Sequence, residues 1–303
     1  MYTSKRTLAV FGCSFTEYGY WPTWSDWLAN SYSNYVKLAI SGTGIKAQFN
    51  RLVEFLNNQS DDQLLNTDVV VQWSSLSRVD FMLVGDKDVY SGGGNVINNG
   101  WIDSEFLEKY FSIYQQVYEA INYIETAKKL LEAKKIRYAM TFMLDPRVGE
   151  YLGEPGQSYD KKDFISYDDI QRAKSLLGKF DKIIDSNFTS KCMTFHQLDE
   201  PNILKVYCHD FGNPEEHPSP LQHYTFMKKY IKPYFKEIEL NKGEKMDKCI
   251  QDWQRFAEIK LSYHDKKHLE PKSFPVPIRL GLGLVEKEYK LKDSPIYRLN
   301  GNR

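Results

Sequence analysis

Short apolar runs alternate with segments of helical periodicity along most of the chain. The runs are rich in β-branched residues and end at Gly or polar clusters, which is typical of buried strands. Between them, apolar residues recur every three or four positions, which indicates amphipathic helices. The predicted strands are Thr7–Phe11, Tyr35–Ile40, Asp68–Trp73, Arg137–Leu144 and Ile203–Cys208, and the clearest helices span 45–56, 103–135 and 168–186. This alternation favours a three-layer α/β/α fold around a parallel sheet of about five strands.

Two stretches interrupt this alternation. Residues 79–102 and 145–166 are rich in Gly, Asn, Pro, Asp and Tyr, so we interpret them as insertions near the functional edge of the sheet. The first has the pattern of an excursion or hairpin, with Ser91–Asn95 as a flexible loop tip. Further on, a helical segment leads into a Pro- and Gly-rich arm. We therefore divide the chain into a domain at 1–238 and a C-terminal extension at 239–303.

Composition excludes several classes of function. Lys plus Arg and Asp plus Glu both number 40, so no net field recruits nucleic acid or an anionic membrane. No run of about 18 apolar residues and no signal peptide is visible. The four cysteines form no CxxC pair, so neither a zinc site nor a disulfide framework is indicated. We expect a soluble protein that is cytoplasmic or associated with an assembly.

A metal site has weak support. His264 and His268 have the i, i+4 spacing of helical metal ligands and flank Asp265, but the region is rich in Lys and lacks an HExxH pattern. A solvated helix face is the favoured interpretation. The Gly run at 92–94 lacks the Lys-Ser/Thr that follows a phosphate-binding loop. We therefore expect neither a metal nor a cofactor.

A serine follows the first predicted strand, in the turn formed by Gly12, Cys13 and Ser14. Open α/β sheets bind their ligands at the carboxyl ends of the strands, so Ser14 is placed where chemistry is expected. Its backbone amide, just before a helix, can also point at a developing oxyanion. A Gly-x-Ser turn after a strand is common, and its meaning depends on a partner elsewhere in the chain.

A histidine lies on a loop near the other end of the predicted domain. Ser219, Pro220 and Gln222 have the spacing of the N-cap, first and third residues of a capped helix. His217 lies just before that cap, beside two acidic residues. A loop histidine in this setting can be held in the tautomer that accepts a proton from serine, although a plain surface histidine is the simpler interpretation of His217 alone.

Together, these two segments resemble the first and last blocks of the SGNH (GDSL-like) hydrolases. The first block of that family resembles GDSxT, and this chain has Gly12–Thr16 with Cys13 in the place of Asp. The last block resembles DxHP, and this chain has Glu215–Pro218. The resemblance implies a flavodoxin-like α/β fold and ester hydrolysis, with Ser14 as the nucleophile and His217 as the general base.

The middle blocks resemble the family less closely. Lys37–Gly42 resembles an NLAxxG segment, which implies that the Gly42 amide joins the Ser14 amide in the oxyanion hole, with Gly44 as a second candidate. The family's GxND block is replaced by the stretch Gln72–Arg78. Within it, Ser75 takes the Asn position, because its hydroxyl can donate a hydrogen bond.

Further residues of the implied site are assigned from the same resemblance. Arg78 is expected to stabilise the site or a substrate carboxylate, or to form a structural ion pair. The triad acid stays open between Glu215, then Glu216, then Asp210. His223 matches a trailing position of the family and is expected to be structural. The resemblance covers about residues 5–238.

The substrate is expected to be an ester, and the aromatic content of 15% suggests an acetylated glycan. Trp73 is assigned to substrate binding, among several aromatic residues expected near the mouth of the site. These are Tyr18, Tyr20, Trp21, Trp24, Trp73, Tyr90 and Trp101. An alternative is a catalytically weak or inactive module that docks on a protein partner through residues 271–303. Acyl transfer to a sugar is a third option.

Overall fold

A computed structural model describes most of the predicted domain and one helix beyond it. The described residues are 4–18, 22–40, 42–76, 78–83, 89–95, 104–143, 166–183, 218–240 and 244–262. Outside them lie the predicted strand Ile203–Cys208, all but the last residue of the insertion at 145–166, the histidines at 264 and 268, and the arm at 271–303.

Four parallel strands form the central sheet, in the order β2-β1-β3-β6. They are β1 (Ser4–Gly12), β2 (Tyr32–Ala39), β3 (Thr67–Trp73) and β6 (Arg137–Phe142). Every residue of β3 is buried, as its nearly continuous apolar sequence predicts for a strand covered on both faces. The structure thus confirms a parallel sheet within an α/β fold.

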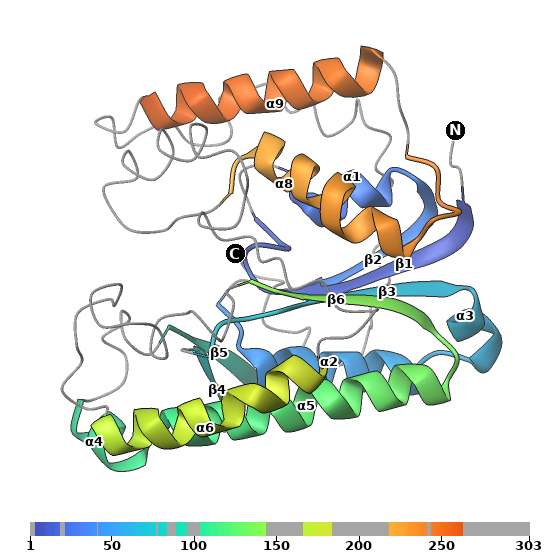
Figure 1. Cartoon of the computed structure of the whole chain (residues 1–303). Coiled ribbons are helices and arrows are strands. Elements are labelled where there is room, and N and C mark those ends of the chain that lie inside the picture. Colours follow the sequence, from blue (N-terminus) through green and yellow to red (C-terminus); the bar gives the residue numbers. More distant parts are fainter. Residues whose placement is uncertain are drawn as a thin grey trace.

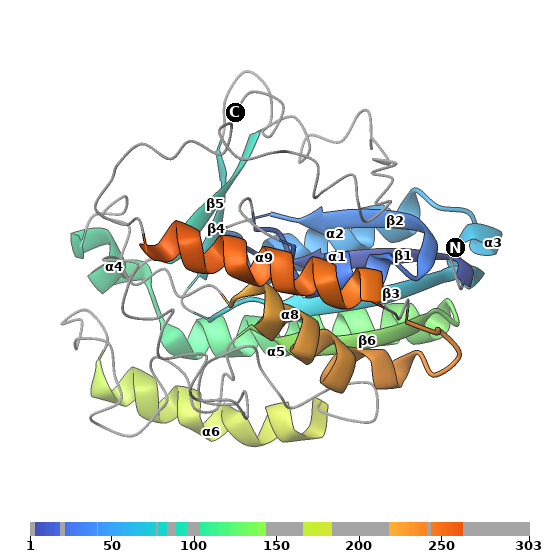
Figure 2. The ribbon, with the colours of Figure 1, turned by 90° about the horizontal axis from the view of Figure 1, so that it is seen from above.

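Helices cover both faces of the sheet (Figure 1). Figure 1 shows α2, α5 and α6 on one face and α1 and α8 on the other, with α9 outermost, and Figure 2 shows α9 lying over α8 from above. The helices are α1 (Trp24–Ala29), α2 (Ile45–Asn57), α3 (Asp61–Leu65), α4 (Ser104–Tyr110), α5 (Ile113–Ala133), α6 (Tyr167–Ile183), α8 (Pro220–Phe226) and α9 (Glu244–Ser262). A π-helical turn, η2 (Met227–Ile231), and a 3-10 turn, η3 (Lys232–Tyr234), continue α8.

Side chains on the two faces of β1 pack into two separate hydrophobic cores. Ala9 and Phe11 pack with α2, α5 and α6, whereas Leu8 and Val10 pack with α1 and α8. This division follows from the two-residue period of a strand, which sends alternate side chains to opposite faces. Trp253 of α9 belongs to the second core, so this helix of the predicted extension packs against the same body as α8.

The single helix predicted over 103–135 is wrong, because the chain forms α4 and α5 with a break at Phe111 and Ser112. Ser112 has extended backbone angles, and its hydroxyl accepts a hydrogen bond from the Gln115 amide. Asp169 of α6 accepts bonds from the Ser112 hydroxyl at 2.7 Å and the Ile113 amide at 2.6 Å. A carboxylate from another helix therefore fixes where α5 begins.

Part of the predicted insertion at 79–102 is a hairpin. Strands β4 (Arg78–Leu83) and β5 (Val89–Asn95) pair antiparallel. The prediction of a flexible loop tip at Ser91–Asn95 is wrong, because these residues belong to β5, and Ser91, Gly92 and Asn95 pair with β4. Their backbone hydrogen bonds, which need no side chains, override the poor strand propensity of Gly.

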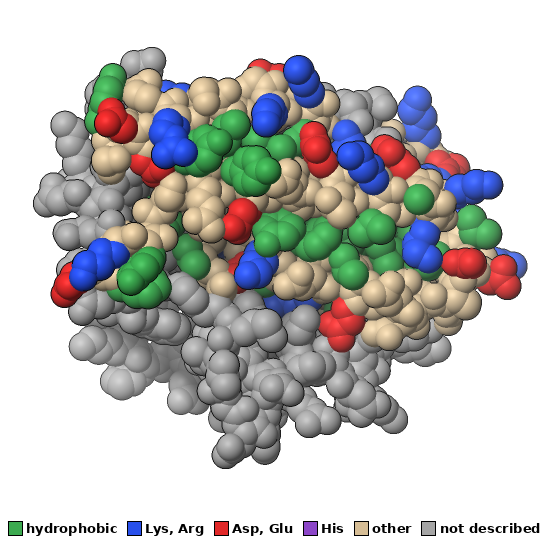
Figure 3. Space-filling model, turned by 90° about the horizontal axis from the view of Figure 1, so that it is seen from below, with side chains coloured by type: hydrophobic (Ala, Val, Ile, Leu, Met, Phe, Trp, Pro, Cys, Tyr) green, Lys and Arg blue, Asp and Glu red, His purple; other side chains and the backbone are tan. Residues whose placement is uncertain are grey.

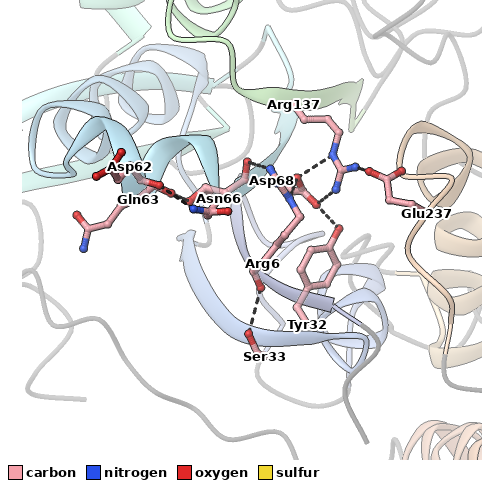
Figure 4. Close-up of polar contacts among 10 residues, drawn as sticks. Arg6, Tyr32, Ser33, Asp62, Gln63, Asn66, Asp68, Arg137 and Glu237 are labelled. Carbon is pink, nitrogen blue, oxygen red and sulfur yellow. Dashed lines mark hydrogen bonds and ion pairs between the residues drawn. The ribbon is translucent and has the colours of Figure 1, made fainter.

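A buried carboxylate ties the four strands together at the amino end of the sheet (Figure 4). Asp68 of β3 has no exposed surface. It accepts bonds from Arg6 of β1 at 2.8 Å, from Tyr32 of β2 at 2.9 Å and from Arg137 of β6 at 2.8 Å. Arg137 also pairs with Glu237, which follows η3. This network lies at the edge opposite to Ser14, so it stabilises the scaffold rather than the site.

Candidate active site

Ser14 lies just beyond the carboxyl end of β1. The Cys13 carbonyl accepts hydrogen bonds from the amides of Thr16 and Glu17, each at 2.9 Å, which closes a tight turn around the serine. Ser14 is 5% exposed, and its hydroxyl has no hydrogen-bond partner among the described residues. A buried hydroxyl without a partner costs free energy, so its retention points to a catalytic base, a ligand or a water at this position.

Gly12 and Thr16 make the turn that presents Ser14. A Cβ at position 12 would lie 2.5 Å from the Thr16 Cβ and closer still to its hydroxyl, so only Gly fits. The Thr16 hydroxyl donates to Gln72 Oε1 at 2.8 Å, and Trp24 Nε1 donates to the same oxygen at 3.1 Å. The turn after β1 is thereby bonded to the end of β3.

The turn that carries Gly42 is bonded to the last residue of β1. The Gly12 carbonyl accepts from the Ile40 amide at 3.2 Å and from the Thr43 hydroxyl at 3.5 Å. Gly42 has a φ of 81°, in the left-handed region that favours glycine. The predicted oxyanion residues Ser14 and Gly42 therefore lie on two adjoining turns at the same edge of the sheet.

The segment after β3 is anchored to α2. The Ser74 amide donates to Gln48 Oε1 at 3.0 Å, and Ser75 is 5% exposed. Two more buried polar atoms here, Ser74 Oγ and Gln72 Nε2, have no partner within the described part of the chain. Together with Ser14 Oγ, these atoms lie at the carboxyl ends of β1 and β3, where parallel sheets bind ligands.

Arg78 joins this segment to the Gly42 turn. Its guanidinium donates to the Thr43 carbonyl at 3.5 Å, and its amide donates to the Ser75 carbonyl at 3.3 Å. None of the ion pairs between described residues involves Arg78, so its positive charge is available beside the site. This partly exposed guanidinium also lines a pocket.

Asp80 is a site residue that sequence reasoning missed. Its carboxylate accepts from the Gly44 amide at 2.7 Å and from the Ala47 amide at 2.8 Å, which caps α2. Gly44 is the N-cap and has no side chain to bond these amides itself. A Cβ there would lie 2.7 Å from the Arg78 carbonyl oxygen, so Gly44 serves close packing. The sequence gives one signal for this contact: a helix whose N-cap is Gly needs a hydrogen-bond acceptor from elsewhere for its first amides.

Two aromatic residues expected at the mouth of the site are buried instead. Trp24 and Trp73 have no exposed surface, and Trp73 packs in the core with α2 and α5. Because β3 is covered on both faces, a ring at its last position joins the core. Tyr18 is partly exposed. Tyr20, Trp21 and Trp101 lie outside the described residues, and only the backbone of Tyr90 is described.

The predicted base and the candidate acids also lie outside the described residues, namely His217, Glu215, Glu216 and Asp210. The helix after them is as predicted: Ser219 caps α8, Pro220 is its first residue, and Gln222 completes the capping box. In both Figures 1 and 2, α8 begins toward the end of the molecule at which β1 and β3 finish. His223 is fully buried in α8, within the scaffold.

A pocket of about 290 Å³ lies beside this edge. Ser75, Arg78 and Asp80 contribute to its wall, together with residues of α4 and α5, whereas Ser14 and Gly42 do not. Among the residues that the structure describes, no three His, Cys, Asp or Glu side chains gather as a metal ion would require. No described helix is long and apolar enough to span a membrane.

A scan against protein-family models finds no match for this chain, and a search of curated proteins finds none either. Solved structures do match. A GDSL-like lipase from Bacteroides thetaiotaomicron is 18% identical at a TM-score of 0.39, over 77% of this chain and 88% of its own. A member of the lipolytic G-D-S-L family from Veillonella parvula is 12% identical at 0.37, over 74% and 98%. TesA is 14% identical at 0.36, over 77% and 100%.

The first two of these structures are named for the GDSL class that the sequence motifs resemble. At such low identities and TM-scores, no activity or site residue of this chain follows from the likeness.

Proposed function

We propose that this protein is a serine-dependent ester hydrolase with Ser14 as its nucleophile. One observation carries the proposal: the Ser14 hydroxyl is buried at the carboxyl end of β1 and has no partner among the described residues. Such a group is positioned for a base and an acyl carbon rather than for the scaffold. The adjoining Gly42 turn supplies backbone amides at the same edge of the sheet.

The reaction proceeds through an acyl-enzyme. Ser14 Oγ attacks the ester carbonyl while His217 takes the hydroxyl proton, and a tetrahedral oxyanion forms. Collapse breaks the bond between the carbonyl carbon and the leaving oxygen, which receives the proton from His217. Water then attacks the acyl-enzyme, His217 again accepts and returns a proton, and the acid product leaves Ser14 free.

The amides of Ser14 and Gly42 stabilise the oxyanion, with the Ser75 hydroxyl as a further donor. Each such donor contributes about 3–4 kcal/mol to transition-state stabilisation in well-formed sites. The left-handed conformation of Gly42 and its hydrogen-bonded turn hold its amide in a fixed direction. Preorganised donors of this kind need no rearrangement when charge develops.

His217 as the base rests on its position in the chain. It directly precedes Pro218, which is buried at the start of α8, the helix that begins toward the Ser14 end of the sheet. Glu215 is the first choice for the acid that orients it, followed by Glu216 and Asp210. The substrate class that we propose is an O-acetylated carbohydrate, because the exposed aromatic rings of Phe106 and Tyr110 on α4 line the pocket beside the edge.

A fluorophosphonate probe tests this assignment, because it reacts with an activated serine hydroxyl. We expect one probe per chain by intact mass, with the modified peptide containing Ser14 and no labelling of Ser14→Ala. Ser74 is the alternative nucleophile to exclude, since it is a second buried serine at the same edge whose hydroxyl has no partner among the described residues. Ser74→Ala is expected to keep the label. His217→Ala is expected to lose it at neutral pH.

A folded protein that takes no label, or takes it at Ser74, contradicts the proposed nucleophile. The absence of labelling would favour the alternative of a binding module with a hydrolase-like fold. Circular dichroism of each variant separates loss of reactivity from loss of folding.

A further inference from the structure

The pocket beside the Ser14 edge has the size of a small-ligand site. Its volume of about 290 Å³ lies at the lower end of the range for ligand pockets, roughly 300–1,000 Å³. It is formed where β4 and the start of α2 meet α4 and α5. Figure 3 views the molecule from this helix layer and shows hydrophobic side chains interspersed with acidic and basic ones.

Aromatic rings on α4 form one side of the pocket. Phe106 is 44% exposed and Tyr110 is 68% exposed, and their ring centroids lie 4.8 Å apart. Tyr123 of α5 also lines the pocket and packs against Phe49. Large rings that stay exposed beside a cavity offer flat apolar faces at low entropic cost, since a ring has only two side-chain torsions.

The polar groups of the pocket are balanced in charge. Lys46 and Arg78 are basic, and Asp80 and Glu119 are acidic. The carboxylate oxygens of Asp80 bond the amides that start α2, whereas Glu119 accepts from the Gln115 side chain. Because neither sign dominates, an anionic or a cationic ligand meets as much repulsion as attraction.

Two hydrogen-bonding side chains, Gln116 and Arg78, also line the pocket. Gln116 is half-buried. The Arg78 guanidinium donates to the Thr43 carbonyl at a long 3.5 Å. Amide and guanidinium groups near exposed rings complement a ligand that has hydroxyl groups on its edges and C–H groups on its faces. A neutral sugar ring has both features.

We infer that this pocket binds a neutral sugar unit of the substrate, next to the ester that Ser14 attacks. Ser75 lines the pocket and follows β3, the direct neighbour of β1, and Arg78 contacts the turn that contains Gly42. The pocket thus adjoins the reacting edge without including Ser14. The inference rests on the proposed function for the place of the ester, but the binding of the sugar is measurable without any reaction.

A glycan array probed with Ser14→Ala protein tests binding, because this variant cannot turn over an ester. We expect binding to neutral saccharides, reduced about tenfold or more when Tyr110→Ala is added. Tyr118→Ala is the matched control, since Tyr118 is a 47% exposed tyrosine of α5 that does not line the pocket. It is expected to bind as the parent does. Circular dichroism verifies that all variants fold.

Binding to no saccharide, binding to acidic saccharides alone, or equal binding by the Tyr110→Ala variant overturns the inference. Ester hydrolysis gives the second readout, measured on protein that keeps Ser14 and differs from the wild type only at Tyr110. Tyr110→Ala is expected to lower kcat/KM for an O-acetylated neutral disaccharide about tenfold and to leave that for 4-nitrophenyl acetate unchanged, because the small ester does not reach the pocket. An equal loss on both esters also contradicts the inference.

The two proposals fail in different ways. If neither ester is hydrolysed and Ser14 takes no fluorophosphonate, the proposed function is wrong, whatever the array shows. If the esters are hydrolysed and Ser14 takes the fluorophosphonate, but no saccharide binds through Tyr110, only the inference of the sugar subsite is wrong.

Discussion

Thr16 occupies the space in which a side chain at position 12 would lie. The threonine is held there by its hydrogen bond to Gln72 in β3, so it cannot move away without breaking the link between two strands. The turn that presents Ser14 therefore depends on the absence of a side chain at Gly12.

Gly12→Ala is expected to destabilise the protein by about 2–3 kcal/mol, since overpacking a rigid site costs about 1–3 kcal/mol and the Thr16 bond is strained in addition. Gly178→Ala is the matched control. Gly178 lies exposed in α6 with nothing near its Cβ position, so alanine there is expected to stabilise the helix by about 0.5–1 kcal/mol. Urea unfolding measures both, and an equal effect of the two changes contradicts the clash.

Asp80→Ala is expected to cost about 1–2 kcal/mol, because two amides of the first turn of α2 lose their acceptor. The same change is expected to slow fluorophosphonate labelling of Ser14, since the Gly42 turn directly precedes α2. Ser60→Ala removes a comparable cap from the surface helix α3 and is expected to leave labelling unchanged. The unfolding free energy and the labelling rate of both variants show whether the Asp80 cap supports the site, whereas the Ser60 cap stabilises only its own helix.

Asp68→Asn is expected to lower stability by about 3 kcal/mol. Removing one partner of a buried ion pair costs about 3–5 kcal/mol, and we take the lower value because Arg6 and Arg137 are each partly exposed. Glu105→Gln breaks the exposed pair with Lys109 and is expected to change stability by less than about 0.5 kcal/mol. A small effect of Asp68→Asn in thermal or urea unfolding would show that the network is dispensable.

Stability is expected to fall as the pH rises above about 10. Burial, and then the charge and hydrogen bond of Asp68, raise the pKa of Tyr32 well above its ordinary value. In the unfolded chain a tyrosine loses its proton near pH 10, whereas in the folded protein Tyr32 keeps it. The unfolded state therefore binds fewer protons, and alkaline pH favours unfolding.

Tyr32→Phe is expected to lessen this alkaline loss, although it lowers stability by about 1 kcal/mol at neutral pH through the lost hydrogen bond. The slope of unfolding free energy between about pH 9 and 11 is the measurement. Tyr167→Phe, at a 73% exposed position, is expected to leave the slope unchanged. Cys249, whose pKa burial raises to about 11, adds to the same slope in every variant.

Local patterns predicted the elements whose causes lie within a few residues. The apolar runs of β1, β3 and β6 were enough to place these strands, because a strand buried on both faces tolerates little else. The capped start of α8 was likewise predicted from Ser219, Pro220 and Gln222, since the two residues that bond each other in a capping box are three positions apart. Ser14 was placed correctly at a strand end for the same reason.

Tertiary contacts decided what these patterns could not. The end of α4 and the start of α5 depend on Asp169, which is 56 positions from the amide that it binds, and α2 is capped by Asp80 from another element. Trp73 is a core residue because helices cover both faces of its strand. Whether a polar or aromatic side chain faces solvent, a helix end or the core is set by which distant element packs against it, and the free energy of that packing exceeds any local preference. The sequence by itself thus determined the alternation of strands and helices and the position of Ser14 just after β1, whereas only the tertiary structure bonded the turn of Gly42 to Gly12 and Arg78 to the turn of Gly42.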